Sequence, residues 1–101
     1  MTITSKKNAV SALSDVNPEF NFWVCDGTII RNLKELPGVL ANMKDEVFFY
    51  HVNTDKNDFA NWIHDILKDA TLAKDLYRLK DRKAAMKRVA ERIRVLEKKA
   101  K

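Results

Sequence analysis

The sequence predicts an α+β domain that is mostly α-helical, with a short N-terminal β-hairpin packed on four to five helices and a last helix that is long and basic. Three observations predict this class. Aromatic and β-branched residues surround a turn dipeptide near residue 26, apolar residues recur at three- and four-residue spacing after residue 32, and Lys and Arg concentrate after residue 78. The chain has 101 residues, of which 46% are hydrophobic and 33% charged, as is typical of one globular domain.

The chain divides at residue 18. Residues 1–18 are rich in Thr, Ser, Lys and Asn, so we expect a flexible N-terminal arm with no more than a short helix near 9–13. Residues 19–101 are expected to form a single compact domain that ends in a basic amphipathic helix at about 79–99.

Residues 20–30 predict the hairpin. Phe20, Phe22 and Val24 occupy alternate positions, which is the period of a strand with one buried face. Asp26-Gly27 is a strong turn signal, because glycine accepts the positive φ that a tight hairpin turn requires. A lone hairpin is only marginally stable in water, so it is expected to pack on the helices.

Asn32 is expected to cap the first helix of the compact domain, with Glu35 as its capping-box partner. Pro37 leaves two alternatives. Either the helix begins near Leu36, where proline falls in the first turn, or the helix kinks at the proline.

Three further helices are expected from their caps: Asp45 before 46–52, Asn57 or Asp58 before the next helix, and Asp69 before a third. Apolar side chains at helical or strand spacing then predict a core, to which part of the final helix is added. The expected core residues are Phe20, Phe22, Ile30, Leu36, Leu40, Val47, Phe48, Phe59, Trp62, Ile63, Ile66 and Leu76.

The final helix carries a narrow apolar seam at three- and four-residue steps, formed by Leu79, Met86, Val89, Ile93 and Leu96. The seam has two interpretations. It belongs to the core, or it pairs with a second copy of the chain or with a partner helix.

Charge is unevenly distributed. Residues 78–101 hold eleven Lys or Arg and three acids, a net charge of +8, whereas the other residues hold eight and eleven, a net charge of −3. Such a basic end often binds polyanions, although it can also be a solvated helix face. The candidate nucleic-acid-binding residues are Arg78, Lys80, Arg82, Lys83, Lys87, Arg88, Arg92, Arg94 and Lys98.

The most distinctive segment covers residues 50–63. Its polar members are His51, Asn53, Asn57, Asp58 and Asn61. The simpler interpretation is helix capping and turn chemistry, which we favour. The alternative is a polar recognition surface flanked by aromatic side chains.

This segment also carries a resemblance. The pattern D-G … H-V-N-x-x-K-N-D-F-A-N-W-I, which runs from Asp26-Gly27 to Ile63, resembles a family of small archaeal and bacterial domains with no assigned function. The resemblance covers most of the chain after residue 18 and implies no particular activity. Pro37-Gly38 departs from it, because helix formers are expected there.

No enzyme site is expected: the sequence predicts no catalytic residues, no metal ligands and no cofactor. Cys25, His51 and His64 have neither metal-ligand spacing nor a flanking catalytic motif, and the two glycines are isolated and form no phosphate loop. No run of eighteen apolar residues exists, so we expect no membrane partner and a cytoplasmic location.

The sequence therefore predicts a non-enzymatic protein that binds nucleic acid, in the first place duplex DNA, through backbone contacts of the basic helix and without sequence specificity. A chromatin- or nucleoid-associated role fits this prediction. The alternative is a protein-interaction or oligomerisation module that uses the apolar seam of the same helix.

Overall fold

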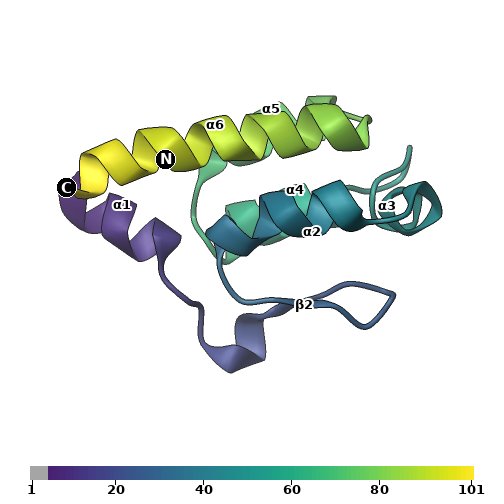
Figure 1. Ribbon diagram of the computed structural model, residues 1–101, viewed down its shortest axis with the longest axis horizontal. Helices are drawn as coiled ribbons and strands as arrows, with labels where there is room; N and C mark the ends of the chain where they lie inside the picture. The colour runs from purple at the N-terminus through teal and green to yellow at the C-terminus, as the bar shows by residue number, and fades with distance from the viewer. Residues whose placement is uncertain (1–4) are drawn as a thin grey trace.

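The structure is a computed structural model that describes residues 5–101. Within this range the chain forms six α-helices, two short 3-10 turns and a two-stranded antiparallel sheet, which confirms the predicted class, α+β and mostly α. Helix α6 (Arg82–Ala100) runs along one side of the molecule, α2 (Leu36–Asn42) packs against it, α4 (Asp58–Asp65) packs against α5 (Ala70–Arg78), and the hairpin lies beyond α2 (Figure 1).

Helix α1 (Lys6–Leu13) occupies much of the segment that was predicted as a flexible arm over residues 1–18. It packs against α6 and buries Ala9 and Ala12. The prediction of a flexible arm is therefore corrected for residues 6–13. The small side chains of Ala9 and Ala12 lie three residues apart on one side of α1, which lets α1 and α6 approach closely. Residues 1–4 of the predicted arm lie outside the described residues.

The hairpin consists of β1 (Phe22–Trp23) and β2 (Ile29–Ile30), which pair antiparallel. The N–H of Val24 donates to the carbonyl of Thr28 at 2.8 Å and closes the turn. Gly27 has φ +97°, so the predicted role of the turn dipeptide is confirmed.

Phe20 differs from the prediction. It ends the 3-10 turn η1 (Pro18–Phe20), and its side chain is exposed although it was expected in the core. Because Pro18 starts the 3-10 turn that includes Phe20, the alternation of buried and exposed strand residues begins only at Phe22. The carbonyl of Phe20 instead accepts a hydrogen bond from the indole N–H of Trp62 at 2.7 Å, which ties this turn to α4.

Helix α2 follows the 3-10 turn η2 (Leu33–Glu35), and the side chain of Asn32 accepts from the N–H of Glu35 at 3.0 Å. The carboxylate of Glu35 accepts from the N–H of Arg31 at 2.8 Å. Pro37 falls in the first turn of α2. Of the two alternatives, the structure therefore shows a helix that begins at Leu36.

Helices α3 (Asp45–His51), α4 and α5 (Ala70–Arg78) occur where they were predicted. The side chain of Asn57 caps α4, and that of Asp69 caps α5. Asp45 is not a cap, since the N-cap position belongs to Lys44 and Asp45 is the first helical residue. There its carboxylate is still favourable, because it faces the positive end of the helix dipole.

Helix α6 begins at Arg82, three residues later than predicted, after a cap by the side chain of Asp81. Its buried side chains are those of Ala85, Val89, Arg92 and Leu96, and Met86 and Ile93 are partly buried against the same core. The apolar seam therefore packs inside the protein, and α6 presents no free seam to a partner helix.

The core lies between α6, α2, α4 and the hairpin. Nine of the twelve expected core side chains are buried, whereas Val47 and Ile66 are partly buried at its edge and Phe20 is exposed. None of the helices in residues 5–101 is both long enough and apolar enough to cross a membrane.

Candidate nucleic-acid interface

Four cations follow one side of α6: Lys83, Lys87, Arg94 and Lys98. Their spacing of four, seven and four residues places them within about 60° of arc around the helix axis. All four side chains are exposed, and none makes a hydrogen bond or an ion pair with any residue that the structure describes. We call this set the basic face.

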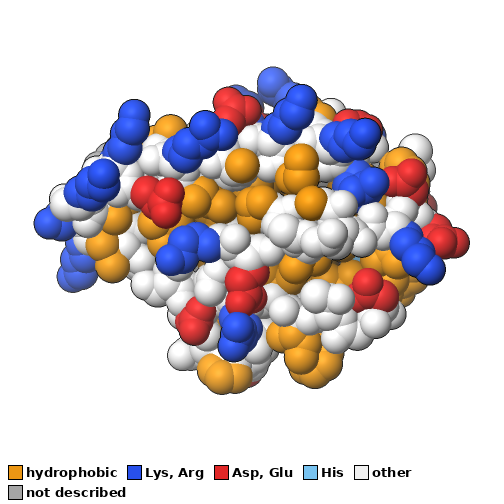
Figure 2. Space-filling model, viewed as in Figure 1, with side chains coloured by type: hydrophobic (Ala, Val, Ile, Leu, Met, Phe, Trp, Pro, Cys, Tyr) orange, Lys and Arg blue, Asp and Glu red, His pale blue; other side chains and the backbone are white. Residues whose placement is uncertain are grey.

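The basic face lies along the longest dimension of the molecule. From Lys83 to Lys98 the helix rises about 22 Å at 1.5 Å per residue. Figure 2 shows Lys and Arg side chains gathered over α6 along the upper edge of the view, with acidic side chains between some of them. Glu91 and Glu97 are the exposed acids of this helix, so positive charge predominates without being uniform.

Arg78 and Lys80 extend the positive charge beyond the start of α6. Both side chains are exposed. Arg78 makes no hydrogen bond or ion pair with the described residues, and the ammonium of Lys80 lies 3.4 Å from the carbonyl of Asn53, which is a weak contact. Six of the nine predicted nucleic-acid contacts are therefore on the surface and able to reach a ligand.

Arg92 is not at the surface. Its guanidinium donates to both carboxylate oxygens of Asp69, at 2.8 and 3.0 Å. The side chain of Arg92 is 7% exposed and that of Asp69 is 0% exposed. The prediction that Arg92 contacts nucleic acid is corrected, because this side chain belongs to the core-facing side of α6 and joins it to the start of α5.

Arg82 and Arg88 are also occupied by the protein itself. Arg82 donates to the carbonyl of Leu40 at 2.7 Å and to Asp45 at 3.0 Å, so it satisfies the free carbonyls at the end of α2. Arg88 donates to Asp75 at 2.7 Å. Both guanidinium groups are partly buried, and each is neutralised by an acid of the body of the protein.

Two exposed cations of α1 lie near the C-terminal end of α6, although the sequence did not indicate them. Lys6 and Lys7 are exposed in the first turn of α1. Helix α1 packs against α6 and begins beside the C-terminal end of α6 (Figure 1), where Figure 2 also shows a concentration of Lys and Arg. The prediction of a flexible arm over residues 1–18 did not place these lysines near the basic helix.

His51 is the centre of the second candidate site. Its ring is buried, and Nε2 accepts a hydrogen bond from the N–H of Cys25 at 3.0 Å. The hydrogen-bond pattern therefore assigns the ring proton to Nδ1, which donates to the carboxylate of Asp58 at 2.9 Å. With both nitrogens engaged, the ring holds the hairpin against α3 and α4 and leaves no free nitrogen to act as a base.

Asp58 is shared by two donors. Besides His51, the ammonium of Lys56 donates to it at 2.9 Å, and the same ammonium lies 4.6 Å from the centre of the Tyr50 ring. Partial burial raises the pKa of Asp58, but hydrogen bonds from Lys56 and His51 outweigh it, so the pKa is lowered overall. Asp58 is therefore an ionised partner of two groups in the folded protein.

The three asparagines of the motif have separate roles. Asn57 is buried, and its side chain accepts from the N–H of Ala60 and donates to the carbonyl of Leu76. Asn53 donates to carbonyls at the end of α3. Asn61 is exposed and accepts from the hydroxyl of Tyr77. Asn57 thus caps α4 and Asn53 bonds to the end of α3, whereas His51 and Asp58 tie the hairpin to α3 and α4, and Asn61 is the one of the five that is exposed.

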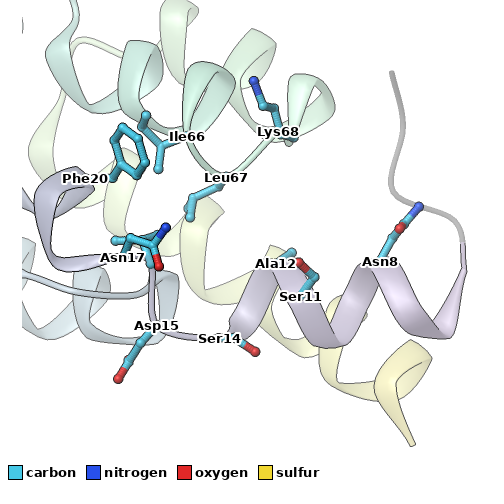
Figure 3. Close-up of a pocket in the computed structure, with 11 residues that line it drawn as sticks. Asn8, Ser11, Ala12, Ser14, Asp15, Asn17, Phe20, Ile66, Leu67 and Lys68 are labelled. Atoms are coloured by element: carbon cyan, nitrogen blue, oxygen red, sulfur yellow. The ribbon is translucent and has the colours of Figure 1, made fainter.

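A further hollow of about 430 Å³ lies between α1, the segment after it and the end of α4 (Figure 3). Its charged residues, Asp15 and Lys68, point away from the hollow in Figure 3, and Asp15 accepts a hydrogen bond from Asn32. A ligand site requires polar groups that converge on one point, and the polar groups of this hollow do not. Within residues 5–101, no group of three or more His, Cys, Asp or Glu has an arrangement that could hold a metal ion.

The chain matches no protein-family model, no curated protein and no solved structure. The resemblance carried by the motif at residues 51–63 therefore stays a prediction, and the functional argument depends on the geometry of this chain alone.

Proposed function

We propose that this protein binds nucleic acid, in the first place duplex DNA, through the basic face of α6, without enzymatic activity and without sequence specificity. One observation carries the proposal. Four cations lie on one side of a rigid helix, exposed and without partners among the described residues. Each cation placed on a phosphate releases condensed counterions, which supplies affinity that does not depend on base sequence.

The dimensions of the basic face suit a duplex backbone. Its length of about 22 Å corresponds to about six base pairs at 3.4 Å per step. The side chains of Lys and Arg reach outward from a helix that the protein core holds in place, so the backbone that carries them need not be ordered on binding. A chromatin- or nucleoid-associated role would follow from such a partner.

The composition of α6 favours a nucleic acid over a membrane surface. A helix that lies in a bilayer interface buries an apolar face in the lipid. In α6 the apolar side chains pack into the protein core except Val95, which is exposed, so the helix has no apolar face to insert. The surface that remains is basic, which suits phosphate contacts without insertion.

The protein-interaction alternative depended on a free apolar seam. Val89 and Leu96 are fully buried, and Met86 and Ile93 pack against the same core. Docking a partner helix on these side chains would require α6 to leave the protein. We therefore carry forward the nucleic-acid proposal alone.

The experiment compares two variants of equal charge. Lys87→Gln/Arg94→Gln removes two cations from the basic face, and Lys34→Gln/Lys44→Gln removes two exposed cations from elsewhere. Glutamine keeps a good helix propensity, so α6 should stay folded. In a fluorescence-anisotropy titration with a 16-base-pair duplex at low salt, the first variant should bind about tenfold or more weakly than the wild type.

The control variant should bind nearly as well as the wild type. Equal losses in both variants would mean that net charge acts without a defined surface. No binding by the wild-type protein would overturn the proposal itself.

A further inference from the structure

A small polar hollow lies where the 51–63 motif meets the beginning of the basic end. Its volume is about 280 Å³, close to the lower limit of about 300 Å³ for small-ligand sites. One wall is the turn at residues 53–57, and the other is formed by Asn61, Tyr77 and Lys80. The hollow therefore joins two segments, 53–61 and 77–80, that are separate in the sequence.

Tyr77 provides a fixed aromatic surface on one wall. Its side chain is 42% exposed, and its hydroxyl donates to the side-chain oxygen of Asn61. This hydrogen bond anchors the hydroxyl end of the Tyr77 ring. A planar group that stacks on the ring therefore does not have to immobilise a freely rotating side chain, which would cost binding free energy.

Two donors around the hollow are available to a ligand. The side-chain nitrogen of Asn61 makes no hydrogen bond with the described residues, since only its oxygen is used by Tyr77. The ammonium of Lys80 has the weak 3.4 Å contact with the carbonyl of Asn53, which a phosphate could replace. The Tyr77 ring is thus flanked by the Asn61 amide, which can recognise a polar edge, and by the Lys80 ammonium, which can pair with an anion.

The hollow lies close to the proposed DNA-binding surface. Lys83 of the basic face follows Lys80 by three positions, so their Cα atoms lie within about 11 Å of each other. Asp55 lies on the opposite rim and is exposed, and its negative charge disfavours a second phosphate on that side. The arrangement suits one nucleotide at the end of a bound strand.

We propose that the hollow binds a single unpaired nucleotide at a duplex end, with the base on the Tyr77 ring, the Asn61 amide on the edge of the base and Lys80 on the phosphate. This inference rests on the proposed function, because the basic face would hold the adjoining duplex. An unpaired nucleotide suits the hollow, because its base offers both a free face to the Tyr77 ring and a free edge to the Asn61 amide, whereas a paired base has its edge occupied.

The test uses three 16-base-pair probes: a blunt duplex, the same duplex with a two-nucleotide 3′ overhang, and the same duplex with a two-nucleotide 5′ overhang. The wild-type protein should bind one overhang probe more tightly than the blunt probe, by roughly 5- to 100-fold, which is the range for one base stacked on an aromatic ring. Tyr77→Leu should lose this preference and keep its affinity for the blunt duplex.

Three control variants separate the hollow from general effects. Tyr77→Phe keeps the ring and should retain most of the preference. Asn61→Ala removes both the donor and the anchor of the ring and should weaken the preference. Trp23→Leu changes an aromatic side chain that is 65% exposed on the hairpin and should leave the preference unchanged.

The outcomes distinguish this inference from the proposal on which it rests. Equal affinity of the wild-type protein for all three probes would overturn the nucleotide site and leave duplex binding intact. A preference that survives in folded Tyr77→Leu would also overturn it. No affinity for any probe would overturn both.

Discussion

Arg92 and Asp69 form an ion pair that solvent hardly reaches. The arginine joins the middle of α6 to the first turn of α5, and the same carboxylate accepts from the N–H of Leu72 as a helix cap. Removing one partner would leave the other charge buried and unpaired, which costs far more than the pair itself contributes. This pair is therefore a structural element and not part of the DNA-binding surface.

Arg92→Met should lower the free energy of unfolding by about 3–5 kcal/mol, because it leaves the Asp69 carboxylate buried without its counterion. Asp69→Asn/Arg92→Met removes both charges, keeps a capping side chain and should recover a large part of this loss. Urea unfolding followed by circular dichroism measures both variants.

Arg94→Met is the matched control, because Arg94 is exposed two residues along the same helix. It should change stability by less than about 0.5 kcal/mol. If Arg92→Met were as stable as Arg94→Met, the buried pair would not have the role described.

Asp58 makes stability depend on pH in a defined direction. Its folded pKa lies below the unfolded value of 3.8, so its contribution is fully present above that value and is lost as the pH falls through the folded pKa. Asp58→Asn should be less stable than the wild type at pH 7 and should lose less stability between pH 5 and pH 3.

The measurement is the free energy of unfolding from urea titrations across this pH range. Asp55→Asn serves as the comparison, because the Asp55 side chain is exposed and makes no hydrogen bond or ion pair with the described residues. A curve for Asp58→Asn parallel to the wild-type curve would mean that Lys56 and His51 do not stabilise the ionised carboxylate.

The Arg92 position also shows what could have been read from the sequence. It lies three residues after Val89 and four before Leu96, so helical spacing alone places it among the buried side chains. We assigned it to the surface because arginine is seldom buried, and the acid that makes burial tolerable, Asp69, is 23 residues away. No local pattern predicts such a distant partner.

At the scale of the elements, Asn57 connects two helices. Its side-chain oxygen caps α4, and its side-chain nitrogen donates at 2.9 Å to the carbonyl of Leu76 near the end of α5. The residue was predicted as a cap from its position before an apolar helix, and this is confirmed. Its second hydrogen bond depends on how α5 packs on α4, which the sequence does not reveal.

Asn57→Ala should cost about 2–3 kcal/mol, which is more than a cap alone contributes, because a buried carbonyl also loses its donor. Asn57→Ser keeps the capping oxygen but is too short to reach Leu76, so its loss should lie between that of Asn57→Ala and zero. Thermal unfolding of both variants gives the order. A loss for Asn57→Ala no greater than that of Asn57→Ser would mean that the link to Leu76 contributes nothing.

Most helix boundaries followed from caps, and the exceptions have physical reasons. Asn57 and Asp69 mark the starts that they were expected to mark, whereas Asn32 caps the 3-10 turn η2 that precedes α2. Helix α1 was missed as an ordered element although Ser5 caps it, because its two buried residues are alanines and carry little hydrophobic signal. Its order depends on contact with α6, which is distant in the sequence.

At the scale of the whole molecule, the acidic body of the protein neutralises part of the basic C-terminal end through ion pairs. The acidic body supplies Asp45, Asp69 and Asp75 to three arginines of the basic end. Composition predicted the asymmetry correctly but not how much of it is neutralised on folding. Four of the cations that remain free, Lys83, Lys87, Arg94 and Lys98, are grouped on one side of α6, which is what the proposed function requires.

The salt dependence of duplex binding tests the central claim most directly, because it counts the phosphates that are neutralised. The logarithm of the affinity should fall linearly with the logarithm of salt concentration, with a slope of about −3.5 for the four cations of the basic face and about −5.5 if Arg78 and Lys80 also make contact. The nine residues predicted from the sequence would give about −8. Two duplexes of unrelated sequence should give the same slope, whereas absent binding, or affinity that does not change with salt, would contradict the account.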